Sequence, residues 1–225
     1  MKTTRIAQAL MLVGALLTVA AIPAASVKDM AESMSADGLE QIKVKGIDLV
    51  YSRPGTQLAS YSKLKIDPVQ VAFRKDFEPK KTGSHMKLGT EELERIRSDV
   101  GKLVYEEFVK ELGKSTYAKV EVAGPDVLHV RPSILDLYVN APDSMEAGRS
   151  RTYTMSAGEM TLVMDIADSE TGQVLARVYD KREGRDTGSI SWSNSVTNQA
   201  EARRIAANWA GILRARLDAA HGIGK

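Results

Sequence analysis

Few side chains in this sequence could do covalent or acid–base chemistry. The chain has no cysteine, and its histidines are His85, His129 and His221. Nucleophilic catalysis needs a nucleophile within reach of a base, which is most often a histidine. Only His129 falls in an expected strand, and there a plain surface or edge histidine is the simpler interpretation. The sequence also lacks a Gly-x-Ser-x-Gly motif. We therefore expect no catalytic residue and no enzymatic activity.

Carboxylates are the remaining candidates for acid–base work. Asp136, Asp165 and Asp180 fall in expected strands and could meet across a sheet as a catalytic pair. Asp180 follows the positions of its strand that are expected to face inward, which are Val174, Ala176 and Val178. A buried carboxylate needs a partner, and an arginine would be suitable. A structural hydrogen bond is the first interpretation of Asp180, and a hydrolase that uses strand carboxylates stays open as a less favoured function.

Neither metal ligands nor phosphate-binding glycines form a recognisable pattern. Asp165 and Asp168 are expected to lie on opposite faces of one strand, whereas a metal site needs clustered ligands. The stretch Gly184–Gly188 lacks the Walker pattern and the strand-to-helix context of a phosphate loop. We expect no metal and no cofactor.

Two long polar connections carry the residue types that are enriched at protein-binding hot spots, namely tryptophan, tyrosine and arginine. They span Glu146–Met155 and Arg182–Asn194. The candidate partner-binding residues are Arg149, Arg151, Tyr153, Arg182, Arg185 and Trp192. Trp192 has an alternative role, in which it closes one end of the apolar core instead of contacting a partner.

Two amphipathic helices are expected to support these loops, over residues 90–112 and about 198–220. Apolar residues recur at helical spacing in both segments. Gly101 lies close to the apolar stripe of the first helix, and its missing side chain would let that helix approach a sheet closely. Each stripe needs an apolar surface to cover it.

Five segments read as strands, and Ile42–Tyr51 could also be extended. The five segments are Tyr61–Phe73, Tyr117–Val122, Val127–Asn140, Gly158–Asp168 and Gln173–Arg182. Pro68 predicts a bulge, an edge or a break in the first strand because proline has no N–H to donate. The stretch Ser169–Gly172 predicts a hairpin turn in which Gly172 has a positive φ. The order is strand, helix, four strands, helix, which predicts an α+β fold with one mixed or antiparallel sheet packed by two helices.

The N-terminus has the order of a secretory signal: Lys2 and Arg5, an apolar run over residues 9–22, then small residues. Cleavage is expected between Ser26 and Val27. We therefore expect a leader over 1–26, a flexible segment over 27–41, one domain over 42–220 and a tail over 221–225. The formal charge of +2 falls to about zero without the leader's two cations, which gives no support for nucleic-acid binding.

The chain resembles a known bacterial envelope family. The resemblance rests on DGL at Asp37–Leu39, YSKLKIDPVQVAF at Tyr61–Phe73, and the stretches Gly124–Asp143, Asp168–Asp180 and Asn198–Asp218. In this order they resemble the family known as domain of unknown function 3313, over nearly the whole chain after the leader. The resemblance implies an envelope location and no agreed activity. Many members look like lipoproteins with a lipidated cysteine, which this sequence lacks.

These observations predict an exported, non-enzymatic protein of the cell envelope. It would be periplasmic, secreted or peripheral at the outer membrane, with no stable membrane span after cleavage. It would act by binding an envelope protein through a sheet edge or through the two loops that carry Tyr153 and Trp192. The alternative is a periplasmic module that binds a small molecule or glycan, which would need a concave apolar pocket.

Overall fold

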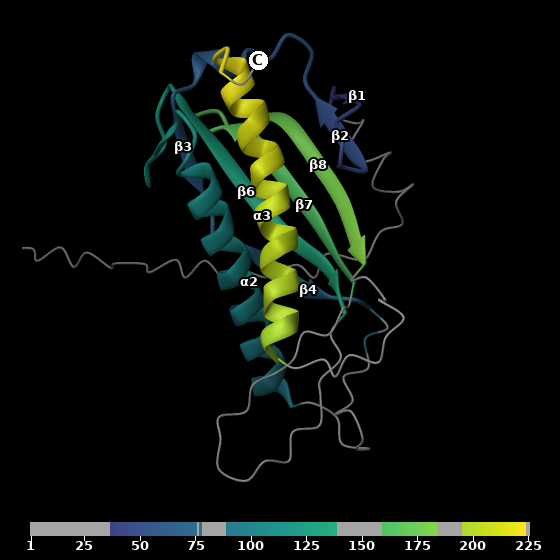
Figure 1. Ribbon diagram of the computed structural model, residues 1–225. Helices are drawn as coiled ribbons and strands as arrows, with labels where there is room; N and C mark the ends of the chain where they lie inside the picture. The colour runs from purple at the N-terminus through teal and green to yellow at the C-terminus, as the bar shows by residue number, and fades with distance from the viewer. Residues whose placement is uncertain (1–36, 76, 78–88, 139–158, 184–194, 224–225) are drawn as a thin grey trace, which may run out of the picture.

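The computed structural model describes residues 37–75, 77, 89–138, 159–183 and 195–223 (Figure 1). The expected leader and its cleavage positions Ser26 and Val27 lie outside these residues. The elements that follow one another along the chain are β1 (Glu40–Ile42), β2 (Leu49–Ser52), the short 3-10 helix η1 (Leu58–Ser60), β3 (Lys63–Ile66), β4 (Gln70–Phe73), α2 (Thr90–Leu112), β5 (Ala118–Lys119), β6 (Val127–Leu137), β7 (Glu159–Asp168), β8 (Val174–Glu183) and α3 (Ser195–Ala220).

One mixed sheet holds all eight strands of the described residues, in the order β1-β2-β8-β7-β6-β3-β5, and β4 also pairs with β6. The strands from β1 to β6 in this order pair antiparallel. On its other side β6 pairs in parallel with β3 and then with β4. The expected α+β class, with one sheet and two helices, is confirmed. The structure differs in detail because the segment at Ile42–Tyr51 contributes to β1 and β2 and the first expected strand is divided into β3 and β4.

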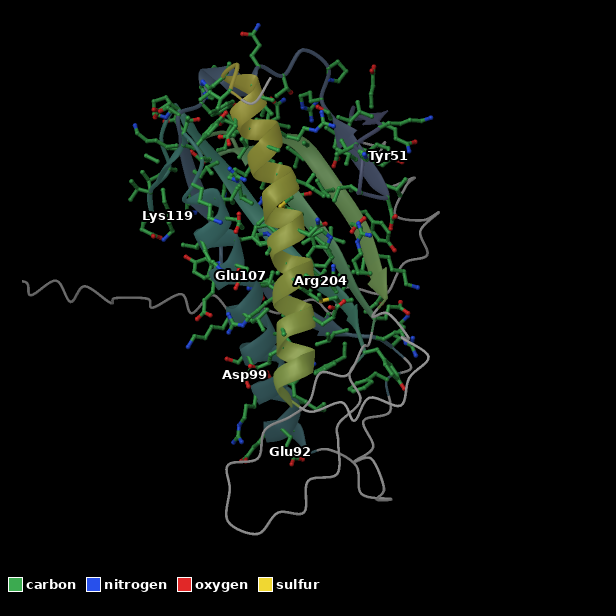
Figure 2. The ribbon with its side chains drawn as sticks, viewed as in Figure 1. Tyr51, Glu92, Asp99, Glu107, Lys119 and Arg204 are labelled. Carbon is green, nitrogen blue, oxygen red and sulfur yellow. The ribbon has the colours of Figure 1, made fainter. Side chains whose placement is uncertain are left out.

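Both helices lie side by side on one face of the sheet (Figure 1). Their apolar stripes and the even-numbered residues of β6 and β7 enclose the main core, in which Phe108 of α2 and Trp209 of α3 are 0% and 1% exposed. Glu107 lies between the two helices (Figure 2), where Lys110 and Arg203 pair with its carboxylate at 3.2 and 3.3 Å. The helices therefore form one layer and the sheet the other.

The division between β3 and β4 lies at Pro68, and α2 packs closely against the chain just after it. A Cβ placed on Gly101 would lie 2.9 Å from the carbonyl oxygen of Val69. The predicted break at Pro68 and the predicted close approach of Gly101 to the sheet therefore occur at the same place in the fold. On β6, Pro132 pairs with Met164 of β7 and lies opposite the gap between β3 and β4, so its missing N–H interrupts no ladder.

Two bulges shift the alternation of the strands. The register of β8 against β7 changes at Leu175, which is buried in the main core. Val174 therefore lies on the opposite face, in a cluster with Tyr51 and Tyr179, and its expected inward position was wrong. The second bulge is at Asp136 of β6, which has a φ of +51° and marks a one-residue shift against β4. These irregularities are not encoded in a period-2 pattern.

Residues near both ends of the described chain pack on the sheet. Asp37 makes side-chain contacts, Leu39 is 4% exposed and β1 starts at Glu40. His221 packs its ring 4.9 Å from that of Tyr117 and places Nε2 3.0 Å from the carbonyl oxygen of Tyr61. His221 thus packs against the segments around Tyr61 and Tyr117. No helix in the described ranges has both the length and the apolar character needed to cross a bilayer.

Candidate partner-binding surface

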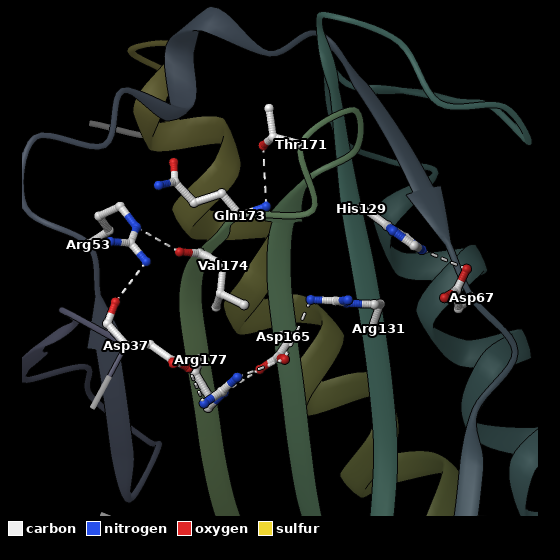
Figure 3. Close-up of polar contacts among 10 residues, drawn as sticks. All are labelled: Asp37, Arg53, Asp67, His129, Arg131, Asp165, Thr171, Gln173, Val174 and Arg177. Carbon is white, nitrogen blue, oxygen red and sulfur yellow. Dashed lines mark hydrogen bonds and ion pairs between the residues drawn. The ribbon is translucent and has the colours of Figure 1, made fainter. Parts of the chain in front are cut away.

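The face of the sheet opposite the helices carries a row of charged side chains across three strands (Figure 3). Arg131 of β6, Asp165 of β7 and Arg177 of β8 occupy one register position. Arg177 donates from Nε to Asp165 Oδ1 at 2.5 Å and from Nη2 to Oδ2 at 3.1 Å, and Nη2 of Arg131 lies 3.6 Å from Asp165 Oδ2. Side chains directly opposite one another on neighbouring strands interact in this way. We call this surface the open face.

The segment Asp37–Leu39 packs along one side of the open face, and we call this segment the latch. The carboxylate of Asp37 accepts a hydrogen bond from Arg177 at 3.0 Å, and its carbonyl oxygen accepts one from Arg53 at 2.8 Å. Gly38 has a φ of +69°, a conformation that favours glycine. Leu39 then packs against Tyr51 and Tyr179 on the open face. The DGL motif thus holds the start of the domain against β2 and β8.

A second polar group lies on the open face of β3 and β6. Nε2 of His129 lies 2.7 Å from Asp67 Oδ1 and 3.3 Å from Nζ of Lys65. Burial alone would raise the pKa of Asp67, but the hydrogen bond and charge of His129, together with Lys65, outweigh it and place the pKa below its ordinary value. His129 therefore joins an ion-paired group and is not a lone edge histidine.

Most charges on the open face are compensated within it, and Arg131 is the least compensated. Its nearest carboxylate is 3.6 Å away, its side chain is 37% exposed, and its Nε has no hydrogen-bond partner among the described residues. Arginine is well suited to bind carboxylates because its guanidinium can donate two parallel hydrogen bonds. The open face can therefore accept an acidic group from a partner next to β6.

Arg182, one of the six sequence candidates, lies in a different place, at the side of the core. Its Nε donates to Asp180 Oδ2 at 2.6 Å. Asp180 is fully buried and also accepts hydrogen bonds from the Trp209 indole at 2.6 Å and from the backbone N–H of Asp48 at 2.9 Å. Burial raises the pKa of Asp180, while the donors act in the opposite direction. The expected arginine partner of this aspartate is confirmed.

The strand carboxylates do not form a catalytic pair. Asp165 lies on the open face, whereas Asp180 points to the helix layer and contacts Trp209. Asp136 lies five residues along β6 from Arg131, the residue opposite Asp165, which corresponds to roughly 15 Å along a strand. No group of three or more potential metal ligands occurs in the part of the chain that the structure describes.

The other five candidates, Arg149, Arg151, Tyr153, Arg185 and Trp192, lie outside the described residues. Their segments attach to neighbouring strands at one end of the sheet. Tyr138 N–H, just after β6, donates to the carbonyl oxygen of Glu159 at 2.9 Å, and Glu159 pairs with Glu183 at the end of β8. Both connections therefore leave the sheet at the ends of β6, β7 and β8.

Sequence reasoning missed most of the open face. Lys65, Asp67, Arg131 and Arg177 were not among the candidate residues, although the strand alternation could have grouped them on one surface. Their register could not be obtained from local spacing, because β3, β6 and β8 are far apart in the chain. The role of Asp37 had one sequence signal, the DGL motif.

Together these features define a two-layer α+β domain that has two helices on one face of the sheet and an ion-paired polar surface on the other. The chain belongs to the family described as "Protein of unknown function (DUF3313)", whose model matches residues 30–213. A search of curated proteins found no match.

Solved structures with detectable similarity share little sequence with this chain. A PelC dodecamer from Paraburkholderia phytofirmans has 10% identity and a TM-score of 0.39, covering 73% of this chain and 96% of that chain. A DUF330 protein from Xanthomonas campestris has 9% identity and a TM-score of 0.41, with coverages of 75% and 93%. A DUF4136 protein from Bacteroides thetaiotaomicron has 12% identity and a TM-score of 0.37, with coverages of 80% and 97%. These values are too low to assign a shared function or assembly.

Proposed function

We propose that this chain is an exported, non-catalytic protein of the cell envelope that binds another protein through its open face. The observation that carries the proposal is the ordered row of partly exposed charged side chains on the sheet face opposite the helices. Because the row is held in place by neighbouring strands, little side-chain entropy is lost when a partner binds it. The leader-like residues 1–26 support export.

The geometry favours binding over catalysis. The three strand carboxylates are distributed over two faces of the sheet, and Nε2 of His129, 2.7 Å from Asp67, also lies 3.3 Å from Nζ of Lys65. Acid–base catalysis needs groups that reach the same reacting atoms, and Asp165 and Asp180, on opposite faces of the sheet, do not share such a position. The arrangement supports a recognition surface.

The small-molecule alternative has weaker support. A groove of about 280 Å³ lies beside α2, and its lining includes the exposed residues Pro68, Ser98 and Lys102. Ligand pockets usually enclose roughly 300–1,000 Å³ and bury most of their ligand. The groove is at the lower limit of this range and does not enclose its contents, so a protein partner remains the preferred ligand.

Photo-crosslinking in the intact envelope tests the proposal. A photoreactive phenylalanine analogue at Lys65 would sample the open face, and the same residue at Arg204 would sample the exposed side of α3. We expect a discrete protein adduct from position 65 that disappears when Arg131→Glu is added, and none from position 204. Equal adducts from both positions, or an adduct that is indifferent to Arg131→Glu, would contradict the proposal. Recovery of the chain with its leader intact among cytosolic proteins would contradict export.

A role of the two loops that carry Tyr153 and Trp192 in partner binding is a separate prediction. If they contribute to binding, Trp192→Ala combined with Arg185→Ala should abolish co-purification of the crosslinked partner without a change in thermal unfolding. Removal of a tryptophan or arginine hot spot commonly costs 2 kcal/mol or more of binding free energy, by order of magnitude about 30-fold in affinity. Undiminished co-purification would exclude the loops and leave the open face as the site.

A further inference from the structure

A second surface lies at the opposite side of the fold from the latch, where the sheet is interrupted between β3 and β4. Pro68 has no N–H, and the chain bends there toward α2, so that Val69 and Gly101 are in contact. The groove of about 280 Å³ mentioned above lies at this close approach of the helix to the strand.

The groove is lined by apolar and cationic residues. The strand side contributes Pro68 and Val69, and α2 contributes Arg97, Ser98, Gly101, Lys102 and Tyr105. A groove of this size has room for about one large apolar side chain, by comparison with the larger pockets that hold small molecules.

The two cations that line the groove, Arg97 and Lys102, are both partly exposed. The Lys102 side chain is 75% exposed, and its nearest carboxylate, Glu106, is 4.0 Å away. Arg97 contacts Glu94 and lies over the ring of Phe73, with 41% of its side chain exposed. Lys119 of β5 lies beside α2, as Figure 2 shows, with its ammonium 6.0 Å from the ring centre of Tyr105 and 2.6 Å from the carboxylate of Glu121. The residues that line the groove itself include two cations and no acid.

The strand that follows the groove offers a backbone edge. Among the described strands β4 pairs only with β6, so the N–H and C=O groups on its other side have no strand partner there. An extended segment can add to such an edge through main-chain hydrogen bonds. Alternate side chains of an added strand point toward the helix layer, where the groove lies.

We propose that this groove and the free edge of β4 bind an extended, acidic segment of a protein partner, with one apolar side chain of that segment in the groove. The backbone of the segment pairs with β4, and its carboxylates face Arg97 and Lys102. This site goes beyond the open face, since it lies at the other side of β6 and uses none of the same side chains. Strand addition with a pocket for an alternate side chain combines affinity from the backbone with specificity from the pocket.

Titration of ¹⁵N-labelled protein with a synthetic peptide tests the inference. The probe is an acidic ten-residue peptide with a single central leucine. We expect amide shifts confined to Val69–Phe73 and to residues 97–105. Ser98→Trp, which fills the groove, should weaken binding by at least about tenfold. Asp99→Trp, a change at the neighbouring exposed position that does not line the groove, should leave binding unchanged.

The contribution of the groove's positive charge and that of the peptide's leucine side chain are tested separately. Lys102→Glu should weaken binding, whereas Arg95→Glu, with the same change in net charge elsewhere on α2, should not. A peptide with serine in place of leucine should bind more weakly than the parent. Equal binding of the serine peptide, equal effects of Ser98→Trp and Asp99→Trp, or no localised shifts at millimolar peptide would each overturn the inference. Crosslinking at Lys65 reports on the open face only, so the two proposals can fail independently.

Discussion

Asp180 illustrates how a single buried charge ties three elements together. Its two carboxylate oxygens accept hydrogen bonds from β8, α3 and the loop before β2, through Arg182, Trp209 and Asp48. Burial penalises the charge, and the three donors compensate for part of that penalty. A residue that sequence analysis could have read as an acid catalyst is therefore a structural acceptor.

The first prediction concerns this acceptor. Asp180→Asn keeps the shape of the side chain but turns an N–H₂ group toward donors that need an oxygen. We expect a loss of about 1–3 kcal/mol for each buried donor left without a partner, measured by urea unfolding. Asp126→Asn is the matched control, since the same change at an exposed carboxylate paired with Lys63 should have a much smaller effect. Equal midpoints for the two variants would contradict the structural role of Asp180.

A second prediction at the residue scale uses pH. Asp168 Oδ1 accepts hydrogen bonds from the backbone N–H and hydroxyl of Thr171 and from the N–H of Glu170, and these lower its pKa from the usual 3.8 against the opposing effect of burial. Since the folded state binds the proton more weakly than the unfolded state, this contribution is present above about pH 4 and is lost as pH falls through the lowered pKa. The stability difference between wild type and Asp168→Asn should therefore shrink on acidification, measured as urea midpoints at pH 7 and below pH 3. A difference that is constant with pH would contradict this account.

At the scale of the elements, α2 and the divided strand fit together only because Gly101 lacks a side chain. Gly101→Ala places a Cβ 2.9 Å from a backbone oxygen that cannot move without disturbing β4. Helix propensity favours alanine by about 1 kcal/mol, but overpacking commonly costs about 1–3 kcal/mol. We expect a net destabilisation in thermal unfolding.

Gly211→Ala on α3 is the control for that prediction. Gly211 is also inside a helix, but a Cβ there would meet nothing within 4 Å. It should therefore stabilise the protein by up to about 1 kcal/mol. If both alanine variants changed the melting temperature in the same direction, the close approach of α2 to Val69 would not limit the packing.

Local patterns predicted the elements better than their pairing. Helical spacing located both helices, and the turn Ser169–Gly172 has the positive φ expected of Gly172, at +71°. The latch was missed because the contacts of Asp37 with Arg53 and Arg177 join segments up to 140 residues apart. The bulge at Leu175 was missed because the sequence around it shows no break in the alternation of strand residues. Only the pairing of β8 with β7 shows that Leu175 is an extra residue. Long-range register, which creates the open face, has no signature in any single segment.

At the scale of the whole molecule, the latch fixes the first described residues to the sheet. Contacts with β2, with β8 and with Arg53, which follows β2, hold residues 37–42: two arginines bind Asp37, Leu39 packs against two tyrosines, and β1 pairs with β2. The same contacts neutralise Arg177 on one side of the open face. Loss of the latch would thus have two effects at once. It would expose the apolar surface that Leu39 covers, and it would change the charge of the proposed binding surface.

Two truncations test this role of the latch. A chain that begins at Asp37 should unfold at the same temperature as one that begins at Val27, because it keeps every contact of the latch. A chain that begins at Lys43 loses the buried side chain of Leu39, and by analogy with large-to-small core substitutions it should lose about 2–5 kcal/mol. Leu39→Ala in the longer chain separates the apolar contribution from that of β1 and should account for part of the loss. Were the chain that begins at Lys43 as stable as the longer ones, the domain would begin at β2 and the latch would contribute nothing to the fold.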